Sequence, residues 1–379
     1  MSKVFYVCFY ADPEVQNQII TYPSVWSKID YVVDAIKKNG KEVIVFSIAP
    51  ALKNKFTGYE KEIDSAEKHI YISSRSSSNK VVHSFLFVWQ NVKIISYLLR
   101  NVKKDDKVLV YHSLYNRIWL PIYAMLFPKK VILEIEDVFS ALSQKTAHFW
   151  VKEWSIFRHM QRCICVNDIL YQELEDVPQK MVSYGSYNIP PRYAKNTSGK
   201  IRLVYAGVVE QERNAAFLAV QSMLYLTDVY ELHILGFGND SDVEALKRLI
   251  DSVNEKKNTD CVCYHNRMNN EEYWKFLQSC DIALSTHSYT AENYKSSLYT
   301  FPSKILTYLA NDLRVVAQRL EVLEQSQVCP YIWFYDEPTP EALAQAICSI
   351  DISEQYGSRS FISQIDKQFR IDLQSIMDD

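Results

Sequence analysis

The feature that most constrains the fold is an alternation of short apolar runs with longer amphipathic stretches, which recurs along the whole chain. In the first half the apolar runs occupy residues 4–10, 42–48, 106–113, 129–137 and 163–166. Helical stretches separate several of them, near 23–39, 81–101 and 167–175. A parallel pair of strands needs a crossover connection, usually a helix, so this alternation predicts a parallel α/β domain.

The second half repeats the pattern after a loop rich in turn-forming residues. Residues 182–200, VSYGSYNIPPRYAKNTSGK, contain two glycines and two adjacent prolines and are the best linker candidate. At 379 residues the chain is long enough for two α/β domains. We therefore expect a Rossmann-like domain over 1–190, a second over 191–355, and a C-terminal helix over 356–379 that packs back on the first domain.

Composition indicates a folded protein, with 48% apolar and 23% charged residues. The apolar run 4–10 is followed at once by Asp12 and Pro13, so it is too short for a signal peptide. The stretch 81–99 holds polar residues that suit a membrane span poorly. A cytoplasmic location is the expectation.

Two Cys-x-Cys pairs, Cys163/Cys165 and Cys261/Cys263, invite a zinc interpretation. Both pairs lie in short strand-like runs, where residues two apart share one face. They also fall in different predicted domains. Buried, reduced core cysteines are the favoured interpretation, and we expect no metal site.

Charge is unevenly divided between the halves. Residues 1–190 carry 24 Lys and Arg against 19 Asp and Glu, whereas the remainder carries 18 against 26. A basic first half suits an anionic acceptor or a membrane surface, although solvated surface explains such a split equally well. The segment 148–162 mixes aromatic and basic residues. It could lie on a membrane interface, but a core-facing helix is favoured.

Polar residues follow two of the predicted strands in the first half. His112 comes after one, and Glu134, Glu136 and Asp137 come at the end of the next. Ligands bind at the carboxyl ends of strands in open parallel sheets. With Ile135 between them, the two glutamates should share one face. A carboxylate here, Glu136 first and Asp137 second, could act as a general base or steady positive charge, with His112 as the alternative catalytic group. Each could equally be a helix cap or surface group.

Four motifs follow one another in the second half at similar intervals. They are YAGVVEQERN (205–214), LHILGFGND (232–240), NRMNNEEYWKFLQSCDIALS (266–285) and FPSKILTYLANDLRVVA (301–317). In order and spacing they resemble the donor-binding domain of GT-B glycosyltransferases, especially the large retaining family four. The resemblance implies a GT-B fold, in which two Rossmann-like domains face each other across a cleft. It covers residues 200–320 well and the first half only in general layout.

The glycines and Arg213 supply the first part of the expected donor site. Gly207 ends a strand where the backbone must approach a ligand closely, and Gly236 and Gly238 form a second strand-to-loop crossing. Arg213 begins the following helix, in a segment where the resembled family commonly places Arg or Lys to reach a diphosphate. A solvated helix-start charge is the plain alternative.

The FPSKILTYLA segment supplies the second part. Pro302 suits the first turn of a helix, so Ser303 and Lys304 should offer backbone N–H groups to a diphosphate at its positive end. Lys304 shares a helix face with Thr307 and Tyr308. In the resembled enzymes this face meets the phosphates and the nucleoside. An ordinary amphipathic helix is the alternative.

Two features depart from the resembled family. The family often has two glutamates eight residues apart, but this chain has Tyr299 and Thr307 at the matching positions. The glycine-rich loop after the first strand is also missing, because residues 10–25 contain no glycine. These departures leave ribose contact to other groups and leave the stereochemistry of transfer open.

The resemblance implies transfer of a sugar from a UDP- or GDP-sugar to a saccharide or lipid-linked acceptor, without a metal or other cofactor. It further implies a role in bacterial cell-surface polysaccharide or capsule assembly. Peripheral contact with the inner face of the membrane is expected, and no nucleic-acid partner is. Two alternatives stay open: a non-catalytic relative that serves as a binding or scaffold protein, and a nucleotide-sugar epimerase.

Overall fold

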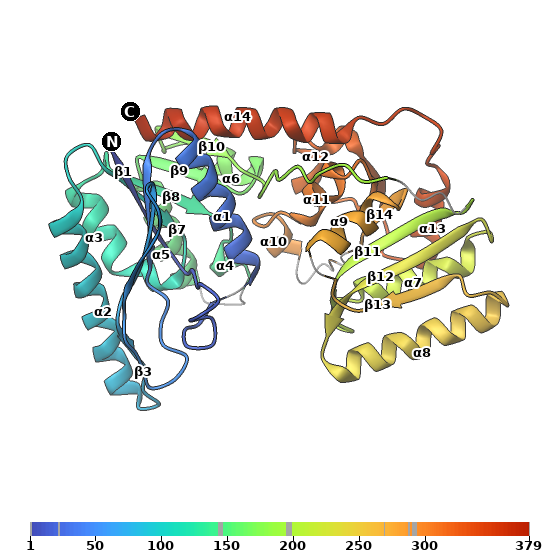
Figure 1. Ribbon diagram of the computed structural model, residues 1–379, viewed down its shortest axis with the longest axis horizontal. Coiled ribbons are helices and arrows are strands. Elements are labelled where there is room, and N and C mark those ends of the chain that lie inside the picture. The colour runs from blue at the N-terminus through green and yellow to red at the C-terminus, as the bar shows by residue number, and fades with distance from the viewer. Residues whose placement is uncertain are drawn as a thin grey trace. The chain divides into compact units, whose positions relative to one another are not determined.

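The computed structural model describes residues 2–21, 23–142, 147–194, 199–268, 270–286, 289 and 294–378 (Figure 1). The chain forms two compact units. The first unit comprises Met1–Ser186, Tyr299–Phe301 and Lys367–Asp379, and the second comprises Tyr187–Leu298 and Pro302–Asp366. Each unit is an α/β body with its own sheet.

The sheet of the first unit has eight strands in the order β10-β9-β8-β7-β1-β2-β5-β4. Every neighbouring pair is parallel except β4 with β5. The strands are β1 (Lys3–Cys8), β2 (Glu42–Ser47), β4 (Glu60–Asp64), β5 (Glu67–Tyr71), β7 (Lys107–Tyr111), β8 (Val131–Ile135), β9 (Arg162–Cys165) and β10 (Gln179–Val182). A separate antiparallel pair joins β3 (Lys55–Phe56) to β6 (Ser74–Arg75).

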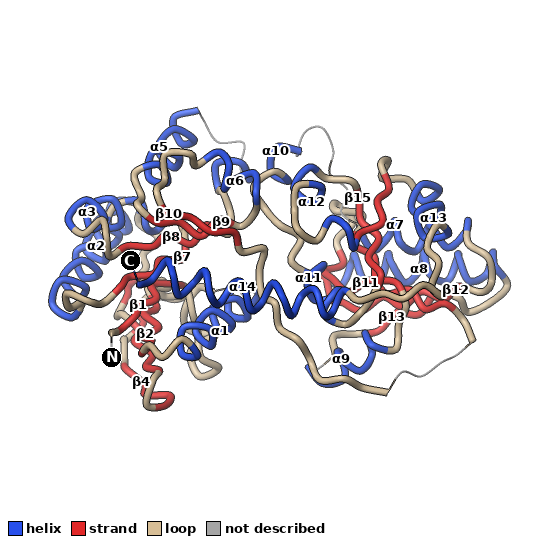
Figure 2. The backbone as a smooth tube through the Cα atoms, turned by 90° about the horizontal axis from the view of Figure 1, so that it is seen from above, coloured by secondary structure: helices blue, strands red, loops and turns tan. Residues whose placement is uncertain are grey.

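Helices cover both faces of this sheet. The helices of the first unit are α1 (Pro23–Lys38), α2 (Lys80–Asn101), α3 (Trp119–Leu126), α4 (Phe139–Leu142), α5 (Ala147–Arg158), α6 (Asp168–Glu173) and the C-terminal part of α14 (Ser358–Asp378). In Figures 1 and 2, α1 lies on one face of the sheet, and α2 and α3 lie on the other. Phe369 of α14 packs against Tyr31 of α1, with ring centroids 5.2 Å apart.

The second unit has a six-stranded parallel sheet in the order β13-β12-β11-β14-β15-β16. Its strands are β11 (Ile201–Val209), β12 (Tyr230–Gly238), β13 (Val262–His265), β14 (Ile282–Ser285), β15 (Arg314–Gln318) and β16 (Ile332–Tyr335). Its helices are α7 (Ala215–Ser222), α8 (Asp240–Lys257), α9 (Asn270–Gln278), α10 (Tyr294–Ser297), α11 (Lys304–Ala310), α12 (Glu321–Glu324) and α13 (Pro340–Cys348). Buried side chains of α7, α8 and α13 form one core with β11 and β12.

Side-chain burial tests two of the predictions, those for the cysteine pairs and for the segment 148–162. Cys163 and Cys165 are buried in β9, and Cys261 is buried just before β13, as expected of core cysteines. Cys263 of β13 is only half-buried, so the expectation holds for three of the four. In the segment 148–162, Trp154 and Phe157 are buried, so its described side chains confirm the core-facing interpretation. The side chains of residues 148–151 lie outside the described part.

The glycines of the GFG motif correct one expectation. Gly236 and Gly238 belong to strand β12 and do not form a loop, and β11 runs two residues beyond Gly207. Gly207 and Gly236 are register partners on these neighbouring strands. A Cβ at Gly236 would lie 2.0 Å from the carbonyl oxygen of Gly207, and one at Gly238 would lie 2.1 Å from that of Val209. These two glycines therefore allow β11 and β12 to approach closely.

We predict that Gly236→Ala destabilises the second unit, because its methyl group would force β11 and β12 apart. Overpacking of this kind costs about 1–3 kcal/mol. Thermal or urea unfolding measures the loss. Gly357→Ala is the matched control, since no atom lies within 4 Å of its added Cβ. Equal stability of the two variants would contradict the close approach.

Candidate functional site

The predicted site residues divide between the two units. His112, Glu136 and Asp137 follow β7 and β8 of the first unit, at the carboxyl ends of parallel strands. Gly207, Arg213, Gly236, Gly238, Ser303, Lys304 and Thr307 belong to the second unit.

A buried lysine of α1 organises the carboxylates that follow β8. Lys28 Nζ lies 2.9 Å from Glu136 Oε1 and 3.6 Å from Glu134 Oε1. It also donates to Ser183 Oγ at 2.6 Å and to the Gly185 carbonyl at 3.3 Å, both just after β10. The shared cation confirms that Glu134 and Glu136 lie on one face.

Glu134 is a fully buried member of this cluster. Its Oε2 accepts a hydrogen bond from the hydroxyl of Tyr6 on β1. Burial raises the pKa of Glu134 to about 7, although Lys28 opposes the shift. Since Glu134 is fully buried and bonded to Tyr6, it is a structural group that ties the end of β8 to β1.

Asp137 differs from both glutamates, because no described residue donates a hydrogen bond to it or forms an ion pair with it. Its side chain is half-buried. Burial, reinforced by the negative charges of Glu136 and Glu153, raises the pKa of Asp137 to about 6. A carboxylate that titrates near neutrality, without a cation beside it, has the properties of a general base. On this geometry Asp137 is a better candidate than Glu136.

His112 is held in place by Glu153 of α5. Its Nε2 lies 2.9 Å from Glu153 Oε1, and the other ring nitrogen, Nδ1, is buried without a hydrogen-bond partner in the described part of the chain. Burial alone would raise the pKa of Glu153, but hydrogen bonds from His112 and from the Ser140 backbone keep it below its ordinary value. The His112 ring is buried and packs against Phe139 and Phe157, with ring centroids 5.5 and 4.8 Å away.

In the second unit, Lys304 reaches the carboxyl-terminal part of β11. A Cβ placed on Gly207 would lie 2.6 Å from Lys304 Nζ and 2.6 Å from the Tyr205 hydroxyl, so both side-chain ends lie against Gly207. Nζ also lies 6.0 Å from the centre of the Tyr205 ring. The sequence motif that contains Gly207 and the one that contains Lys304 thus meet at a single point.

The charge at this point is unusual. Lys304 is an exposed residue, but its ammonium group lies against Gly207 and beside the Tyr205 ring. This desolvation, with the nearby positive charge of Arg213, lowers the pKa of Lys304 to about 8. Arg213 is 66% exposed and pairs with Glu210 at 2.8 Å. Two cations at the end of a parallel strand form a suitable site for a diphosphate.

The start of α11 corrects a second expectation. The helix begins at Lys304 and has seven residues, with Ser303 as its N-cap, whereas the sequence predicts a start near Pro302. The Ser303 side chain makes no capping hydrogen bond. So short a helix contributes little dipole. Lys304 and Arg213, not helix polarity, are therefore the main source of positive charge here.

Thr307 and Tyr308 of α11 have different surroundings. Thr307 is half-buried, and its carbonyl accepts a hydrogen bond from Asn311 at 2.8 Å. Tyr308 is fully buried, and its hydroxyl bonds to both the N–H and the carbonyl of Ala206, at 3.0 and 3.2 Å. Tyr308 thus ties α11 to β11 and does not face a ligand. The contact of Thr307 with the donor stays a prediction.

Tyr299, at one of the two positions where the resembled family has glutamate, belongs to the first unit. Its hydroxyl donates to the Glu173 carboxylate at 2.8 Å, and its ring packs edge-on against Trp154. This position therefore serves packing in the first unit.

Two further observations bear on ligand sites. A cavity of about 800 Å³ lies near the start of β11, lined by Arg202, Lys275 and Phe276 among others, and contains none of the predicted donor residues. Among the described residues, no group of three or more His, Cys, Asp and Glu side chains could hold a metal ion.

No helix of the described part is long and apolar enough to cross a membrane.

The sequence did not predict the roles of three residues in these clusters: Lys28, Glu153, and Tyr308, which bonds α11 to β11. Lys28 lies on the same helix as Lys37 and Lys38, and its residue type alone does not show that it is buried. Only the repeated apolar neighbours of α1 hint that one lysine faces the core.

No protein-family model matches the chain, and neither does any curated protein sequence. Solved structures do match over almost its whole length. An Escherichia coli trehalose-6-phosphate protein bound with UDP-2-fluoro glucose matches with a TM-score of 0.62 and 10% identity, covering 98% of this chain and 99% of that one. A trehalose-phosphate synthase from Burkholderia xenovorans in complex with glucose-6-phosphate gives 0.62 and 8%, covering 100% and 98%.

The sucrose-phosphate synthase from Thermosynechococcus elongatus matches with a TM-score of 0.58 and 13% identity, covering 100% of this chain and 95% of that one. At such low identity the matches establish the fold and nothing finer. The chain has the GT-B fold, with two Rossmann-like domains. The narrower assignment to family four is not confirmed.

We predict that Lys28→Gln destabilises the first unit by about 3–5 kcal/mol, because it leaves buried carboxylates without their cation. Urea unfolding measures the loss. The deficit should shrink as pH falls from 8 to 5. Glu134 has a raised pKa in the folded state, and once protonated it no longer needs a cation.

The matched control is Lys38→Gln on the same helix. Lys38 pairs with Asp34 at 2.9 Å, but both side chains are well exposed. Surface pairs contribute about 0–1 kcal/mol. If both variants lose the same small amount, Lys28 is not the structural centre of this cluster.

Proposed function

We propose that this chain is a glycosyltransferase that moves a sugar from a UDP- or GDP-sugar to a saccharide or lipid-linked acceptor. The observation that carries the proposal is the approach of Lys304 Nζ to Gly207 on β11 of a GT-B fold, with Arg213 near enough for its charge to lower the pKa of Lys304. A desolvated lysine beside a second cation favours an anion of two adjacent phosphates. Solved proteins with the same fold are bound with UDP-2-fluoro glucose or with glucose-6-phosphate.

In this proposal the second unit, with the domain proposed over 191–355, binds the donor. Lys304 and Arg213 hold the diphosphate and stabilise the charge that develops on it as the sugar leaves. Charge stabilisation of this kind replaces a metal ion, which makes the transfer metal-independent. The backbones of β11 and β12 lie close together here because of Gly207, Gly236 and Gly238. The side chains of Ser303 and Thr307 contribute hydroxyl groups.

The first unit, with the domain proposed over 1–190, takes the acceptor. Asp137 accepts the proton of the attacking hydroxyl. Glu136 forms an ion pair with Lys28 beside it. His112 holds Glu153, which in turn binds the backbone of the segment after β8. The basic character of residues 1–190 suits a phosphate-bearing acceptor of cell-surface polysaccharide assembly. A location at the inner face of the membrane fits such an acceptor.

A sugar-release assay with and without acceptor separates this function from its alternatives. A transferase consumes UDP-sugar rapidly only when an acceptor is present, whereas an epimerase converts the donor alone. A scaffold protein binds the nucleotide and turns over neither. A screen of UDP, GDP and their sugars by thermal shift identifies the donor first, since a ligand at 100 times its dissociation constant stabilises by about 2.7 kcal/mol.

We predict that nucleotide-diphosphate affinity falls as pH rises through about 8, because Lys304 must be protonated to attract the phosphates. The slope should approach about tenfold per pH unit above the pKa. Lys304→Gln should abolish the slope and weaken binding at pH 7 by about 10- to 100-fold. Arg213→Gln should weaken binding and move the midpoint to higher pH, because it removes one cause of the lowered pKa.

Calorimetric titration with UDP between pH 6.5 and 9.5 measures these changes. Lys256→Gln on α8 is the control, as an exposed lysine of the same unit. A slope that persists in Lys304→Gln would place the titrating group elsewhere.

We predict that Asp137→Asn lowers the turnover number by about 10²–10⁴-fold, the usual contribution of a general base. Wild-type turnover should fall as pH drops through about 6, since the base must be deprotonated. Affinity for the nucleotide should not change. Glu136→Gln should have the smaller effect, because Glu136 is paired with Lys28. Full activity in Asp137→Asn would leave proton transfer to the donor phosphate.

A further inference from the structure

The outward face of α2 is apolar and exposed. Its inward face buries Asn91, Ile94 and Leu98. On the other side Val81 is 79% exposed and Phe85 is 70% exposed. Further exposed apolar residues of the same helix are Val82, Val88, Trp89, Val92 and Leu99. An apolar stripe this long on a soluble unit is typical of an interaction surface.

Helix α3 extends the apolar surface. It packs against α2 on the same face of the sheet, as Figures 1 and 2 show. Met125 is 76% exposed, and Ile122 and Leu126 are also exposed. Two neighbouring helices therefore present large apolar side chains to solvent.

This part of the chain is also strongly basic. Residues 68–133 contain eleven Lys and Arg but only two acidic residues, Asp105 and Asp106. Asp106 is buried and accepts hydrogen bonds from the backbones of Lys3 and Lys103, so it adds little to the surface. The apolar stripe thus belongs to a segment of the chain with an excess of positive charge.

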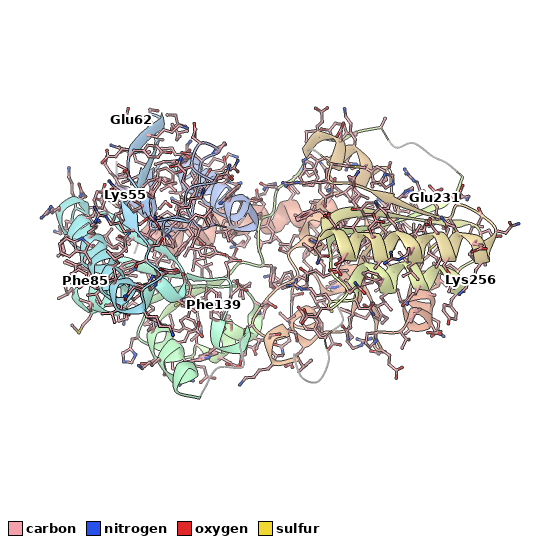
Figure 3. All side chains as sticks on the ribbon, turned by 90° about the horizontal axis from the view of Figure 1, so that it is seen from below. Lys55, Glu62, Phe85, Phe139, Glu231 and Lys256 are labelled. Carbon is pink, nitrogen blue, oxygen red and sulfur yellow. The ribbon has the colours of Figure 1, made fainter. Side chains whose placement is uncertain are left out.

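A cavity of about 500 Å³ lies beside the stripe. Lys55, Arg75 and Lys93 line it, together with Phe85 and Trp89 of the stripe, and none of its lining residues is acidic. Figure 3 shows Lys55 and Phe85 in this region of the first unit.

Two buried polar atoms of the cavity lining, Ser74 Oγ and Gln90 Nε2, have no hydrogen-bond partner in the described part of the chain. Ser74 is only 4% exposed. Buried polar groups normally find partners, so these two donors point to a polar ligand. With three cations around them, the matching group is a phosphate.

We propose that α2 and α3 dock the protein on a bilayer surface that contains anionic phospholipids. The apolar stripe enters the boundary between headgroups and acyl chains, and a lipid phosphate occupies the cavity of Lys55, Arg75 and Lys93. A second copy of the chain is the less favourable occupant, because a symmetric pair would bring two like-charged surfaces together. The described aromatic residues of 152–162 are buried, which leaves that segment unsuited to the role.

Co-sedimentation tests this with vesicles of phosphatidylcholine alone and of phosphatidylcholine mixed with phosphatidylglycerol. The wild-type chain should sediment only with the anionic vesicles, and less so as salt rises, since exposed charges are screened over about 8 Å at physiological ionic strength. Lys55→Gln/Arg75→Gln should bind about 30-fold more weakly, as two cations each add to the attraction. Phe85→Ser/Trp89→Ser should bind at least about tenfold more weakly.

Matched controls remove similar groups elsewhere. Arg248→Gln/Lys256→Gln changes two exposed cations of α8, and Val229→Ser/Ile371→Ser changes two side chains that are 52% and 61% exposed. Both should bind vesicles as the wild type does. All four variants should keep the wild-type unfolding temperature and UDP affinity, so the result is independent of the proposed glycosyl transfer.

Three results would overturn the proposal. The first is no binding, or equal binding to neutral and anionic vesicles. A second is an equal loss in the control variants. The third comes from sedimentation velocity: a wild-type dimer that Phe85→Ser/Trp89→Ser dissociates, without vesicle binding, would assign the surface to a second copy of the chain.

Discussion

The ammonium group of Lys28 is the point on which the first unit depends. A buried charge costs several kcal/mol unless it is paired, so the strands around it must deliver partners. Glu134 and Glu136 come from the end of β8, and Ser183 and Gly185 from the end of β10. The ammonium group of Lys28 thus binds groups at the ends of both β8 and β10.

The same pairing decides which carboxylate remains available for chemistry. Glu134 is bonded to Tyr6 and fully enclosed, and Glu136 faces Lys28. Asp137, one residue further on, has no partner in this network, and burial together with the negative charges of Glu136 and Glu153 keeps its pKa raised. The pairing with Lys28 therefore makes Glu134 and Glu136 structural groups and leaves Asp137 as the candidate for chemistry.

The helix bounds could be predicted closely from periodicity. The pattern predicts helices near 23–39 and 81–101, and α1 spans Pro23–Lys38 while α2 spans Lys80–Asn101. The charged strands β4 and β5 could not be found this way, because EKEID and EKHIY lack apolar alternation. Tertiary pairing at the sheet edge overrides their weak strand propensity.

The candidate site was predictable only as a set of residue types. Motif order brought Gly207 and Lys304 into one hypothesis, and the structure places Lys304 Nζ against Gly207. The pairing of Glu136 could not be foreseen, since it depends on a lysine more than a hundred residues away. Likewise, nothing in the sequence distinguishes Tyr308, which bonds β11, from Thr307 beside it.

The positions of the two missing glutamates limit the chemistry of the proposed transfer. Tyr299 uses its hydroxyl on Glu173, and Thr307 carries no charge at any physiological pH. Neither can balance positive charge on a sugar ring. That task would pass to the donor diphosphate itself, held by Lys304 and Arg213, and to a carboxylate of the first unit. Because Lys304 is desolvated beside a like charge, bound phosphate would raise its pKa and strengthen the contact as negative charge grows on the leaving group. Such a contact is stronger in the transition state than in the ground state, which is the condition for it to accelerate the reaction.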